Sequence, residues 1–510
     1  MRVFVWHGWL LEGSGSNVAT ARVCEVLRAS GHDVVLVCQE PHPERFVWID
    51  AYGSLDAAGP GELTHRRDAS RAPGRCVVLR PVIGSTLPVF VVDRYEGFDD
   101  VKRFVDLSSH ELETYLHVNV EAVRAAVAWH GSEVAIFGHA VPGGAIAHRA
   151  LGPHRAVVKI HGSDLEYAVR HQDRYRELAR EGLATALAVA GPGIEVLERT
   201  AAFVPEVRDL ARVVPPGVDV AAFRPRPRVE ALLEAADRLE RDTTLGRGRR
   251  DSTDADVARA VSDRDRDALD ALAGTYDQDA PDPAAATRLR SLAATDEPVV
   301  GYLGKMIPQK GVELVLAAHR TMLHPSSALI VGFGSHREWL TALDIALADA
   351  DHAALEWLAE AGGMHIGRPE PPAGATAPRN VVFTGRLDHR YAPATLTAMD
   401  VQIVPSTLPE AFGMVAAEGA AAGALIMVAR HSGLAEVAGA LEADVGRPGL
   451  FSFEPGDDAV PRLAAGVDTL LSLPVEERRE IRAAVSAFVG REWTWERTSA
   501  RLLDAALAQR

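Results

Sequence analysis

Short apolar runs and longer helical patterns alternate along the first part of the chain. Residues 2–6 form a β-rich run, residues 18–30 carry apolar positions at helical spacing up to Gly31, and residues 34–38 form a continuous apolar run. A run that is apolar throughout is typical of a strand buried on both faces of a sheet, and glycine commonly follows the last turn of a helix. The pattern therefore predicts a strand–helix–strand unit with parallel strands.

The alternation continues in two series. In the first series the apolar runs span residues 77–79, 89–92, 134–137, 157–160, 186–190 and 212–214, and in the second they span residues 299–303, 328–331, 381–384, 401–404 and 425–428. Helical patterns, such as those of residues 111–130 and 173–181, lie between several of these runs. Strands that alternate with helices predict α/β domains with parallel sheets. We therefore expect two Rossmann-like halves.

The composition changes between the two series, where the chain becomes rich in Asp, Arg and Ala and nearly free of aromatic residues. Such a pattern is typical of exposed helices with ion pairs between successive turns, or of partial disorder. Asp254-Ala-Asp256 and the Asp263–Asp267 run resemble Asp-x-Asp metal motifs, but neither a strand end nor an apolar pocket surrounds them. We interpret both as solvated charged faces. The expected domains are residues 1–225, a charged helical insertion at 226–297, residues 298–474, and C-terminal helices at 475–510 that pack back on the first domain.

Charge and composition exclude several classes of protein. The 510 residues are 47% hydrophobic and 24% charged, with a net charge of −16, so no global field favours nucleic acid or anionic lipid. Three cysteines without a CxxC pair favour a reducing compartment. The N-terminal apolar run is too short for a signal peptide, and no uncharged apolar stretch approaches 18 residues. We therefore expect a cytoplasmic enzyme without a transmembrane segment.

Two histidines and one glycine-rich loop follow predicted strands in the first half. The loop at residues 7–17 can be a phosphate loop before a helix N-terminus or a plain strand–helix turn. His161, in a His-Gly-Ser-Asp segment, stands at the carboxyl end of a strand, where open α/β sheets place ligands. We predict a ligand role for His161 and a structural role for His139, which also follows a strand.

The second half carries two lysines and two glutamates at strand–helix junctions. Lys305 and Lys310 flank a turn between a strand and a helix, which suits a diphosphate. Glu418 follows Glu410 by eight positions, a span of up to about 12 Å in a helix. Two carboxylates at that spacing can hold hydroxyl groups at the two ends of a sugar–diphosphate–ribose unit. The helix N-terminus between them can face the diphosphate.

These segments, in which Lys305 and Lys310 belong to Gly304-Lys-Met-Ile-Pro-Gln-Lys-Gly311, together with three further ones resemble glycosyltransferase family 4, whose members are retaining, nucleotide-sugar-dependent enzymes of the GT-B fold. The further segments are Val213-Val-Pro-Pro-Gly-Val-Asp-Val-Ala-Ala-Phe-Arg-Pro225, Ile330-Val-Gly-Phe-Gly334 and Phe383-Thr-Gly-Arg386. The resemblance covers most of the chain outside the insertion. It implies two Rossmann-like parallel-sheet domains that face a central cleft.

The resemblance also implies roles for individual residues. Gly15 and Ser16 approach the donor phosphate and the acceptor, and His161 contacts the transferred sugar. Lys305 and Lys310 bind the diphosphate, and Glu418 binds the ribose. The remaining implied donor contacts are Arg386 and Leu387 at the nucleobase, and Glu410, Phe412, Gly413, Met414 and Val415 at the sugar hydroxyls and the phosphate. His161, Lys310 and Glu410 form the expected catalytic set.

The chain departs from the usual family pattern at three places. Lys305 stands where arginine is more common, so the charge is kept but not the bidentate geometry. The first loop reads Gly13-Ser-Gly-Ser16 rather than Gly-Gly, and Ser432-Gly433 replaces a Gly-Gly pair. None of these changes removes a charge that the chemistry needs.

The resemblance favours transfer of a sugar to an unidentified hydroxyl acceptor, with no metal and no cofactor besides the donor. The acceptor can be a small molecule, a glycan or a lipid-linked molecule, and no nucleic acid partner is expected. A cluster at Arg170, Arg174, Arg176 and Arg180 leaves local membrane docking open. The alternatives are a GT-B epimerase or phosphorylase, and a degenerate nucleotide-sugar-binding or scaffold protein. The sequence specifies neither the donor base, the sugar, the acceptor, nor the oligomeric state.

Overall fold

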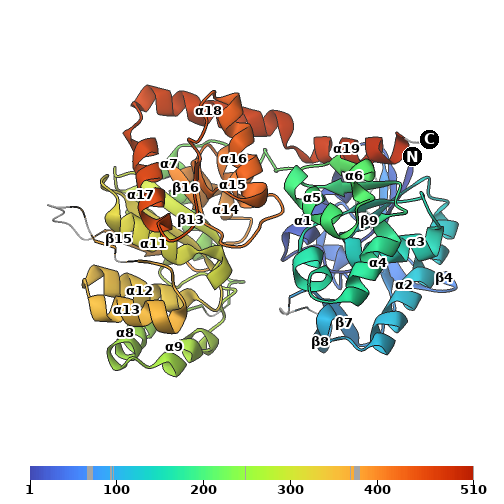
Figure 1. The fold of residues 1–510 in the computed structure, drawn as a ribbon, viewed down its shortest axis with the longest axis horizontal. Helices are drawn as coiled ribbons and strands as arrows, with labels where there is room; N and C mark the ends of the chain where they lie inside the picture. Colours follow the sequence, from blue (N-terminus) through green and yellow to red (C-terminus); the bar gives the residue numbers. More distant parts are fainter. Residues whose placement is uncertain are drawn as a thin grey trace. The chain divides into compact units, whose positions relative to one another are not determined.

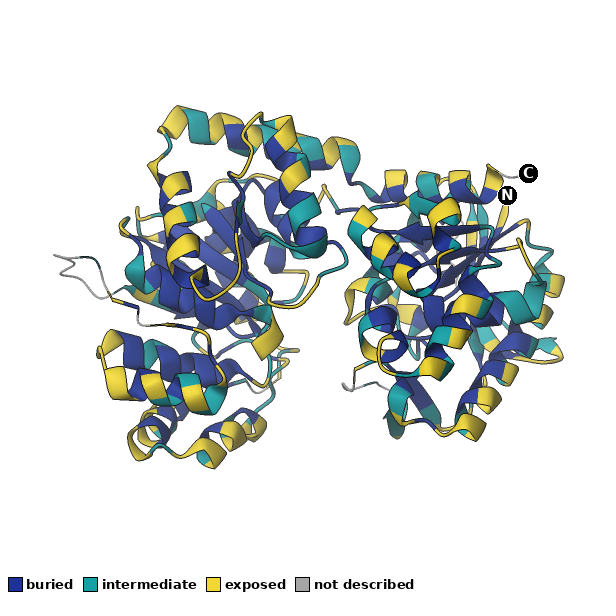
Figure 2. Cartoon of the chain, in the orientation of Figure 1, coloured by how far each residue is buried: buried dark blue, intermediate teal, exposed yellow. Residues whose placement is uncertain are grey.

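The chain forms two compact units, each built around its own sheet. The computed structural model describes residues 1–65, 73–91, 95, 97–246, 248–367, 369–370, 372 and 379–508. Unit 1 comprises Met1–Gly217 and Trp493–Arg510, and unit 2 comprises Val218–Glu492. In each unit the central strands of the sheet are buried and the outer faces of the helices are exposed (Figures 1 and 2).

The central strands of unit 1 form a parallel sheet. Its order is β12-β11-β10-β9-β1-β2-β6-β3-β4, with β5 paired to β3, and β4 and β5 run antiparallel to β3. The strands are β1 (Arg2–Trp6), β2 (Asp33–Val37), β3 (Ala51–Asp56), β4 (Gly59–Pro60), β5 (Thr64–His65), β6 (Arg75–Pro81), β9 (Val134–Gly138), β10 (Val157–Lys159), β11 (Ala188–Gly191) and β12 (Ala211–Val213). β7 (Thr86–Val89) and β8 (Asp100–Arg103) form a separate parallel pair.

The register of unit 1 follows the predicted strand–helix–strand pattern. Phe4 lies between Val35 and Ala135 on the two neighbouring parallel strands. The helices are α1 (Gly15–Ala29), α2 (Ser109–His130), α3 (Ala145–Leu151), α4 (Asp173–Leu183), α5 (Ile194–Phe203), α6 (Val207–Leu210) and α19 (Trp495–Leu507). Ser108 and Glu111 form a reciprocal capping box at the start of α2, which satisfies two otherwise free N–H groups.

Unit 2 has a second, entirely parallel sheet of order β15-β14-β13-β16-β17-β18. Its strands are β13 (Val299–Lys305), β14 (Ser327–Phe333), β15 (Asn380–Phe383), β16 (Val401–Val404), β17 (Leu425–Ala429) and β18 (Ser452–Phe453). Helices α11 (Val312–Thr321), α12 (Arg337–Ala348), α13 (His352–Gly362), α14 (Ala392–Ala398), α15 (Met414–Ala421), α16 (Ser432–Asp444), α17 (Ala459–Ser472) and α18 (Val475–Glu492) follow the strands. The two parallel sheets are the Rossmann-like domains that the alternation predicts.

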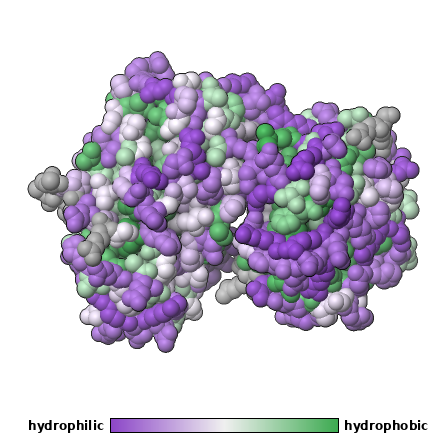
Figure 3. All heavy atoms as spheres, in the orientation of Figure 1, coloured by the Kyte–Doolittle hydropathy of each residue, from purple (hydrophilic) through white to green (hydrophobic). Residues whose placement is uncertain are grey.

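The charged segment at 226–297 packs into unit 2 as four helices with buried faces. These are α7 (Arg228–Arg241), α8 (Thr253–Asp263), α9 (Arg266–Leu272) and α10 (Ala285–Ala293). Helix α7 packs on α10 and α14, and α8 and α9 pack on α12. The visible surface over α8 and α9 is largely hydrophilic (Figure 3), but each helix also buries leucine, valine or alanine side chains. The segment is therefore helical with one buried side, rather than exposed all round.

A buried ion pair fastens this segment to the second unit. Arg249 is 4% exposed and donates to both carboxylate oxygens of Glu338, at 2.9 and 3.2 Å from Nε and 2.9 Å from Nη2. Tyr276 donates its hydroxyl to the same carboxylate. Burial raises the pKa of Glu338, but Arg249, Arg337 and Tyr276 outweigh that effect and the pKa lies below its usual range. Removal of either partner would leave a buried charge without compensation and would lower the stability of the fold.

The C-terminal helices divide between the two units, which differs from the expected packing of all of 475–510 on the first domain. Helix α18 belongs to unit 2 and packs on α15 and α16 through buried Ile481, Val485 and Val489. Helix α19 belongs to unit 1, where it packs on α1. Gly217 is required here, because a Cβ at this position would lie 2.3 Å from the Trp495 backbone nitrogen.

Some elements lie outside the predicted series. The strands β3, β8 and β18 are short or carry polar residues, so no continuous apolar run marks them. The run predicted at 89–92 ends beyond β7, and residue 92 lies outside the described residues. Among the described helices, none is both long and apolar enough to cross a membrane.

Candidate active site

The carboxyl ends of the unit 2 strands bring together the predicted donor residues of the second half. Lys305 ends β13, Phe333 ends β14, and Arg386 follows β15 by three residues. Glu410 lies in the loop between β16 and α15. Because parallel strands end at one edge of their sheet, this edge is where an open α/β sheet binds ligands.

Lys310 and Glu410 form an ion pair at this edge. Lys310 Nζ contacts Glu410 Oε1, and Ser406 Oγ donates to the same oxygen at 2.7 Å. Burial raises the pKa of Glu410, but the Lys310 charge and the two hydrogen bonds outweigh it, and the pKa lies below its usual range. Glu410 is therefore an ionised acceptor. Its side chain is 24% exposed and that of Lys310 is 32% exposed, so both remain within reach of a ligand.

A second layer of residues holds the Glu410 loop in place. Ser432 Oγ accepts a hydrogen bond from the Glu410 backbone N–H at 2.9 Å, and His431 Nε2 lies 2.6 Å from the Ser406 carbonyl. The Gly433 N–H donates to the Glu410 carbonyl at 2.9 Å. A Cβ on Gly433 would lie 2.5 Å from Phe412 Cα, so glycine is required there. Sequence reasoning noted Ser432 and Gly433 only as a departure and missed this supporting role.

Helix α15 begins directly after the loop. Its N-cap Gly413 has φ +100° and would bring a Cβ to 2.5 Å from Leu434, so this turn also requires glycine. Phe412 is buried, whereas Met414 and Val415 are partly exposed. The loop therefore fixes the position of the first turn of α15 together with the backbone N–H groups of that turn. Such a turn is suited to an anion.

Glu418 lies on the next turn of α15 and is half-buried. Burial raises its pKa to about 8, and the nearby Asp219 carboxylate adds to the rise. The carboxyl group therefore binds a proton at neutral pH as the site stands. It contrasts with Glu410 in the same segment, whose positive partner keeps it ionised.

Lys305 and Arg386 meet around one aromatic ring. Lys305 Nζ lies 5.6 Å from the centroid of the Phe333 ring, and Arg386 Cζ lies 5.0 Å from it. Arg386 also forms an ion pair with Asp279 at 3.3 Å. Leu387 is buried and lies outside this exposed cluster. Sequence reasoning missed Asp279, because the segment that carries it has no strand or motif of its own.

In unit 1 the structure places His161 beside His139. Their ring centroids are 4.5 Å apart, and the Trp9 ring lies 4.5 Å from His139. Burial lowers the pKa of both histidines well below the usual range. His7 and Lys159 lower the pKa of His139 further, and His139, Lys159 and His7 lower the pKa of His161 further. His161 Nε2 and His139 Nδ1 have no hydrogen-bond partner among the described residues. Two neutral imidazoles with free polar atoms therefore stand at the ends of β9 and β10.

Asp164 fixes the loop that carries His161. It is fully buried and accepts hydrogen bonds from the backbone N–H groups of Ala140 and Gly162. Burial raises its pKa to about 6, although these backbone donors lower it. The Asp164 side chain thereby ties the turn after β9 to the turn after β10. This tie explains why the two histidines lie together.

The glycine-rich loop of unit 1 ends at the N-terminus of α1. Ser14 caps the helix by accepting from the Asn17 N–H at 3.4 Å, and Ser16 Oγ lies 3.1 Å from Ser14 Oγ. Gly15 is exposed and Ser16 is partly exposed. Asn17 Oδ1 lies 2.9 Å from His7 Nε2, which joins the loop to β1. The backbone of Gly15 is therefore open to a ligand.

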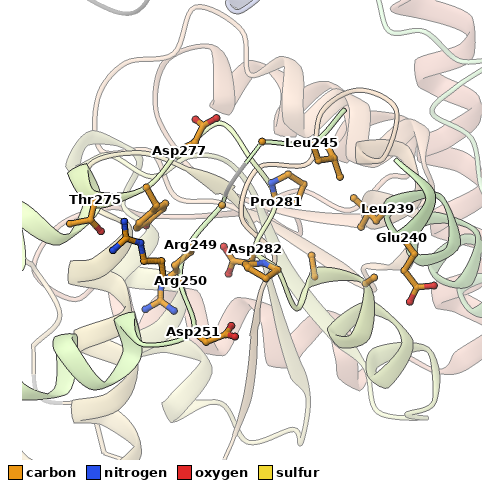
Figure 4. A pocket seen from close by; sticks show the side chains of 16 residues that line it. Leu239, Glu240, Leu245, Arg249, Arg250, Asp251, Thr275, Asp277, Pro281 and Asp282 are labelled. Carbon is orange, nitrogen blue, oxygen red and sulfur yellow. The ribbon is translucent and has the colours of Figure 1, made fainter. Parts of the chain in front are cut away.

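A cavity of about 660 Å³ lies elsewhere in unit 2, within the charged segment (Figure 4). Its walls come from the end of α7, residues 245, 246 and 248–251, residues 275–277 and 281–283, and the start of α10. None of the donor residues predicted from sequence lines it. Across the described ranges, no group of three or more His, Cys, Asp or Glu side chains is arranged to hold a metal ion.

Comparison with known proteins agrees with this reading of unit 2. Residues 297–472 match the family described as Glycosyl transferases group 1. The chain is 30% identical over 216 residues to glycogen synthase of Mycobacterium tuberculosis, covering 41% of this chain and 42% of that protein. It is 28% identical over 283 residues to a GDP-mannose-dependent mannosyltransferase of Mycolicibacterium smegmatis, covering 51% and 63% respectively. The chain thus spans less than two thirds of each of these relatives.

Solved structures extend the similarity to the whole fold. Sucrose-phosphate synthase from Thermosynechococcus elongatus aligns over 100% of this chain and 98% of its own, with a TM-score of 0.56 and 17% identity. The Anabaena protein HepE, solved in complex with UDP and glucose, aligns over 100% of both chains with a TM-score of 0.56 and 13% identity. The chain therefore has the GT-B fold, and its residues 297–472 are similar to the glycosyl transferases group 1 family.

Proposed function

We propose that this protein is a retaining glycosyltransferase of the family 4 type, which moves a hexosyl or hexosaminyl group from a nucleoside-diphosphate sugar to a hydroxyl acceptor. The observation that carries the proposal is the Lys310–Glu410 pair, held between strand ends and the first turn of α15 inside the group 1 region. A cation, an ionised acceptor and free helix N–H groups together suit a sugar phosphate.

The reaction breaks the bond between the anomeric carbon and the diphosphate oxygen. Negative charge then grows on the leaving diphosphate, while the sugar gains oxocarbenium character. Lys305, Lys310 and the first turn of α15 stabilise the leaving group as donors that are already in place. On binding, the diphosphate shares Lys310 with Glu410, and Glu410 accepts hydrogen bonds from sugar hydroxyls.

The remaining residues take the roles that the family resemblance implies. His161 contacts the transferred sugar, and Gly15 and Ser16 approach the donor phosphate and the acceptor. Glu418 holds the ribose, and Arg386 and Leu387 adjoin the nucleobase. Attack from the same face, with a donor phosphate oxygen taking the acceptor proton, gives retention without a protein nucleophile and without a metal.

Acceptor-dependent release of the nucleoside diphosphate tests the proposal. Purified protein is incubated with UDP-, GDP-, ADP- and dTDP-sugars, with and without candidate acceptors, and both the free diphosphate and the product mass are measured. We expect release with one donor only when an acceptor gains one sugar. Glu410→Gln should abolish it, whereas Glu476→Gln, an exposed carboxylate on α18, should not.

The same assay separates the proposal from its rivals. Selective donor binding without transfer to any acceptor would support a degenerate binding or scaffold protein instead. Release without an acceptor, with a rearranged sugar, would support an epimerase. A product of inverted anomeric configuration would refute retention while leaving the transferase proposal in place.

A further inference from the structure

The end of the charged segment reaches the donor edge of the unit 2 sheet. Asp282 donates its backbone N–H to the Thr384 carbonyl at 2.8 Å. Pro281 pairs with Gly385 in an antiparallel bridge. Residues 280–282 therefore run alongside the chain that leaves β15, at the carboxyl edge where open α/β sheets bind ligands.

This contact is built into the backbone and is not a loose surface contact. Gly385 has φ +69°, and a Cβ on it would lie 2.5 Å from the Asp282 nitrogen and 2.7 Å from Asp282 Oδ1. Any other residue at 385 would push the segment away. Glycine at this position therefore lets residues 280–282 lie against the sheet.

Asp282 also anchors the segment through its side chain. It is 6% exposed, accepts from Arg337 at 3.2 Å and from Arg288 at 2.9 Å, and so has two cationic partners. Arg288 additionally donates to the Phe383 carbonyl at 2.7 Å. Arg337 stacks over the Phe383 ring with its Cζ 4.0 Å from the centroid. Backbone and side-chain contacts thus hold the segment at the carboxyl end of β15, which gives the residues just before Asp282 a defined place.

Those preceding residues lie against Arg386. The Arg386 N–H donates to the Ala280 carbonyl at 3.4 Å, and its guanidinium pairs with Asp279 Oδ1 at 3.3 Å. The Asp279 side chain is 43% exposed and that of Arg386 is 37% exposed. A carboxylate and a guanidinium therefore stand together, open to solvent, next to the Phe333 ring. This is the end of the site that the proposed function assigns to the nucleobase.

We propose that Asp279 is a specificity-determining residue for the donor nucleobase and that it selects guanine. The inference rests on the proposed function, since it needs the base to lie at Arg386. A guanine base offers two adjacent N–H donors, at N1 and the 2-amino group, which a carboxylate accepts together. Its O6 and N7 accept two bonds from a guanidinium. Guanine can therefore form two hydrogen bonds with the Asp279 carboxylate and two with the Arg386 guanidinium.

The other bases satisfy the pair less well. Uracil and thymine present a single N–H between two carbonyl oxygens. When the carboxylate accepts from that N–H, one of the carbonyl oxygens lies beside a carboxylate oxygen, and the two acceptors repel each other. Adenine presents its amino group without an adjacent ring N–H. A polar group that the bound base covers and leaves without a partner costs affinity, so each of these bases should bind more weakly than guanine.

Calorimetry of the full-length chain with GDP, UDP, ADP and dTDP tests this inference. We expect wild type to bind GDP at least tenfold tighter than the other three. Asp279→Asn should weaken GDP binding about tenfold and leave UDP binding within twofold. Asp279→Glu should keep most of the preference. Asp267→Asn, which removes an exposed carboxylate from α9, is the matched control and should change neither.

The ratio of the GDP and UDP affinities is the decisive readout, because a purely structural loss would weaken all four nucleotides equally. Equal weakening in Asp279→Asn, or a wild-type preference for UDP, ADP or dTDP, overturns the guanine inference. In that case nucleotide binding that still depends on Glu418 leaves the proposed function standing. Failure of wild type to bind any of the four nucleotides overturns both.

Discussion

In unit 2 charged side chains at the strand ends are paired with one another, whereas in unit 1 two uncharged histidines follow neighbouring strands and keep ring nitrogens without a partner among the described residues. Lys310 meets Glu410 and Arg386 meets Asp279. His139 and His161 instead face each other with free ring nitrogens and lowered pKa values. The difference teaches that one fold can present two kinds of ligand surface.

The physical reason lies in solvation. A partly exposed ion pair keeps both charges and can exchange partners with an anionic ligand such as a diphosphate. Buried imidazoles lose the proton and become neutral donors or acceptors, which suit sugar and acceptor hydroxyls. The proposed reaction needs both, because charge grows on the phosphate while hydroxyl groups must be oriented.

Removal of the Lys310 charge should have the largest effect. We expect Lys310→Ala to lower kcat on the order of 1,000-fold, because a developing charge loses a donor that is already in place. Lys102→Ala removes a surface lysine paired with Glu111 in unit 1 and should leave kcat within twofold. Steady-state kinetics measure both, and equal effects of the two variants would contradict the comparison.

Loss of a neutral imidazole in unit 1 should cost less. We expect His161→Ala to lower kcat/KM about 100-fold, with little change in nucleoside diphosphate binding, since the proposed function assigns this histidine to the sugar and not to the phosphate. Parallel calorimetry with the nucleotide separates the two effects. An equal loss of nucleotide affinity would show that the unit 1 histidines act on the charged part of the donor.

The unit 1 histidines should also make stability depend on pH. His139 stays neutral in the folded chain but takes a proton near pH 6.5 when unfolded, so its contribution is present above pH 6.5 and is lost as pH falls. Urea unfolding followed by tryptophan fluorescence measures the free energy of unfolding at each pH. This free energy should fall less steeply with decreasing pH in His139→Asn than in wild type. The exposed His110→Asn should match wild type.

Nucleotide binding should release a proton in unit 2, and this is the smallest of the expected effects. The raised Glu418 pKa of about 8 means that the carboxyl is mostly protonated at pH 7, and ribose hydroxyl donors favour its ionised form. We expect close to one proton released per nucleotide at pH 7. Calorimetry in buffers of different ionisation enthalpy measures it. Glu418→Gln should release none, and an unchanged value in that variant would assign the proton to another group.

Local sequence patterns anticipated most of the sheet. The runs at 2–6 and 401–404 coincide with β1 and β16, because four apolar residues after Arg2, and three apolar residues around Gln402, are typical of a buried strand. The strand–loop–helix order before and in α15 was also predicted from the sequence, because Glu410, Gly413, Glu418 and Gly419 follow the strand at 401–404 within a short segment. The roles of the site residues themselves stay predictions.

Other features depend on contacts between distant segments. The histidine pair arises because Asp164 ties two turns together, and no spacing in the sequence reports that tie. The supporting bond from Ser432 to Glu410 spans 22 residues, and the pair of Asp279 with Arg386 spans more than a hundred. Such partners are chosen by the packed chain and not by neighbours along it.

Local apolar periodicity specifies the strand–helix alternation and the two-domain organisation, and the residues that follow each apolar run place acidic and basic side chains at the strand ends. Only the tertiary structure decided that the charged segment lies on Gly385 and brings Asp279 to Arg386, and that α18 and α19 join different units. The reason is that docking depends on the complementarity of surfaces formed after the elements fold, which no short stretch of sequence contains.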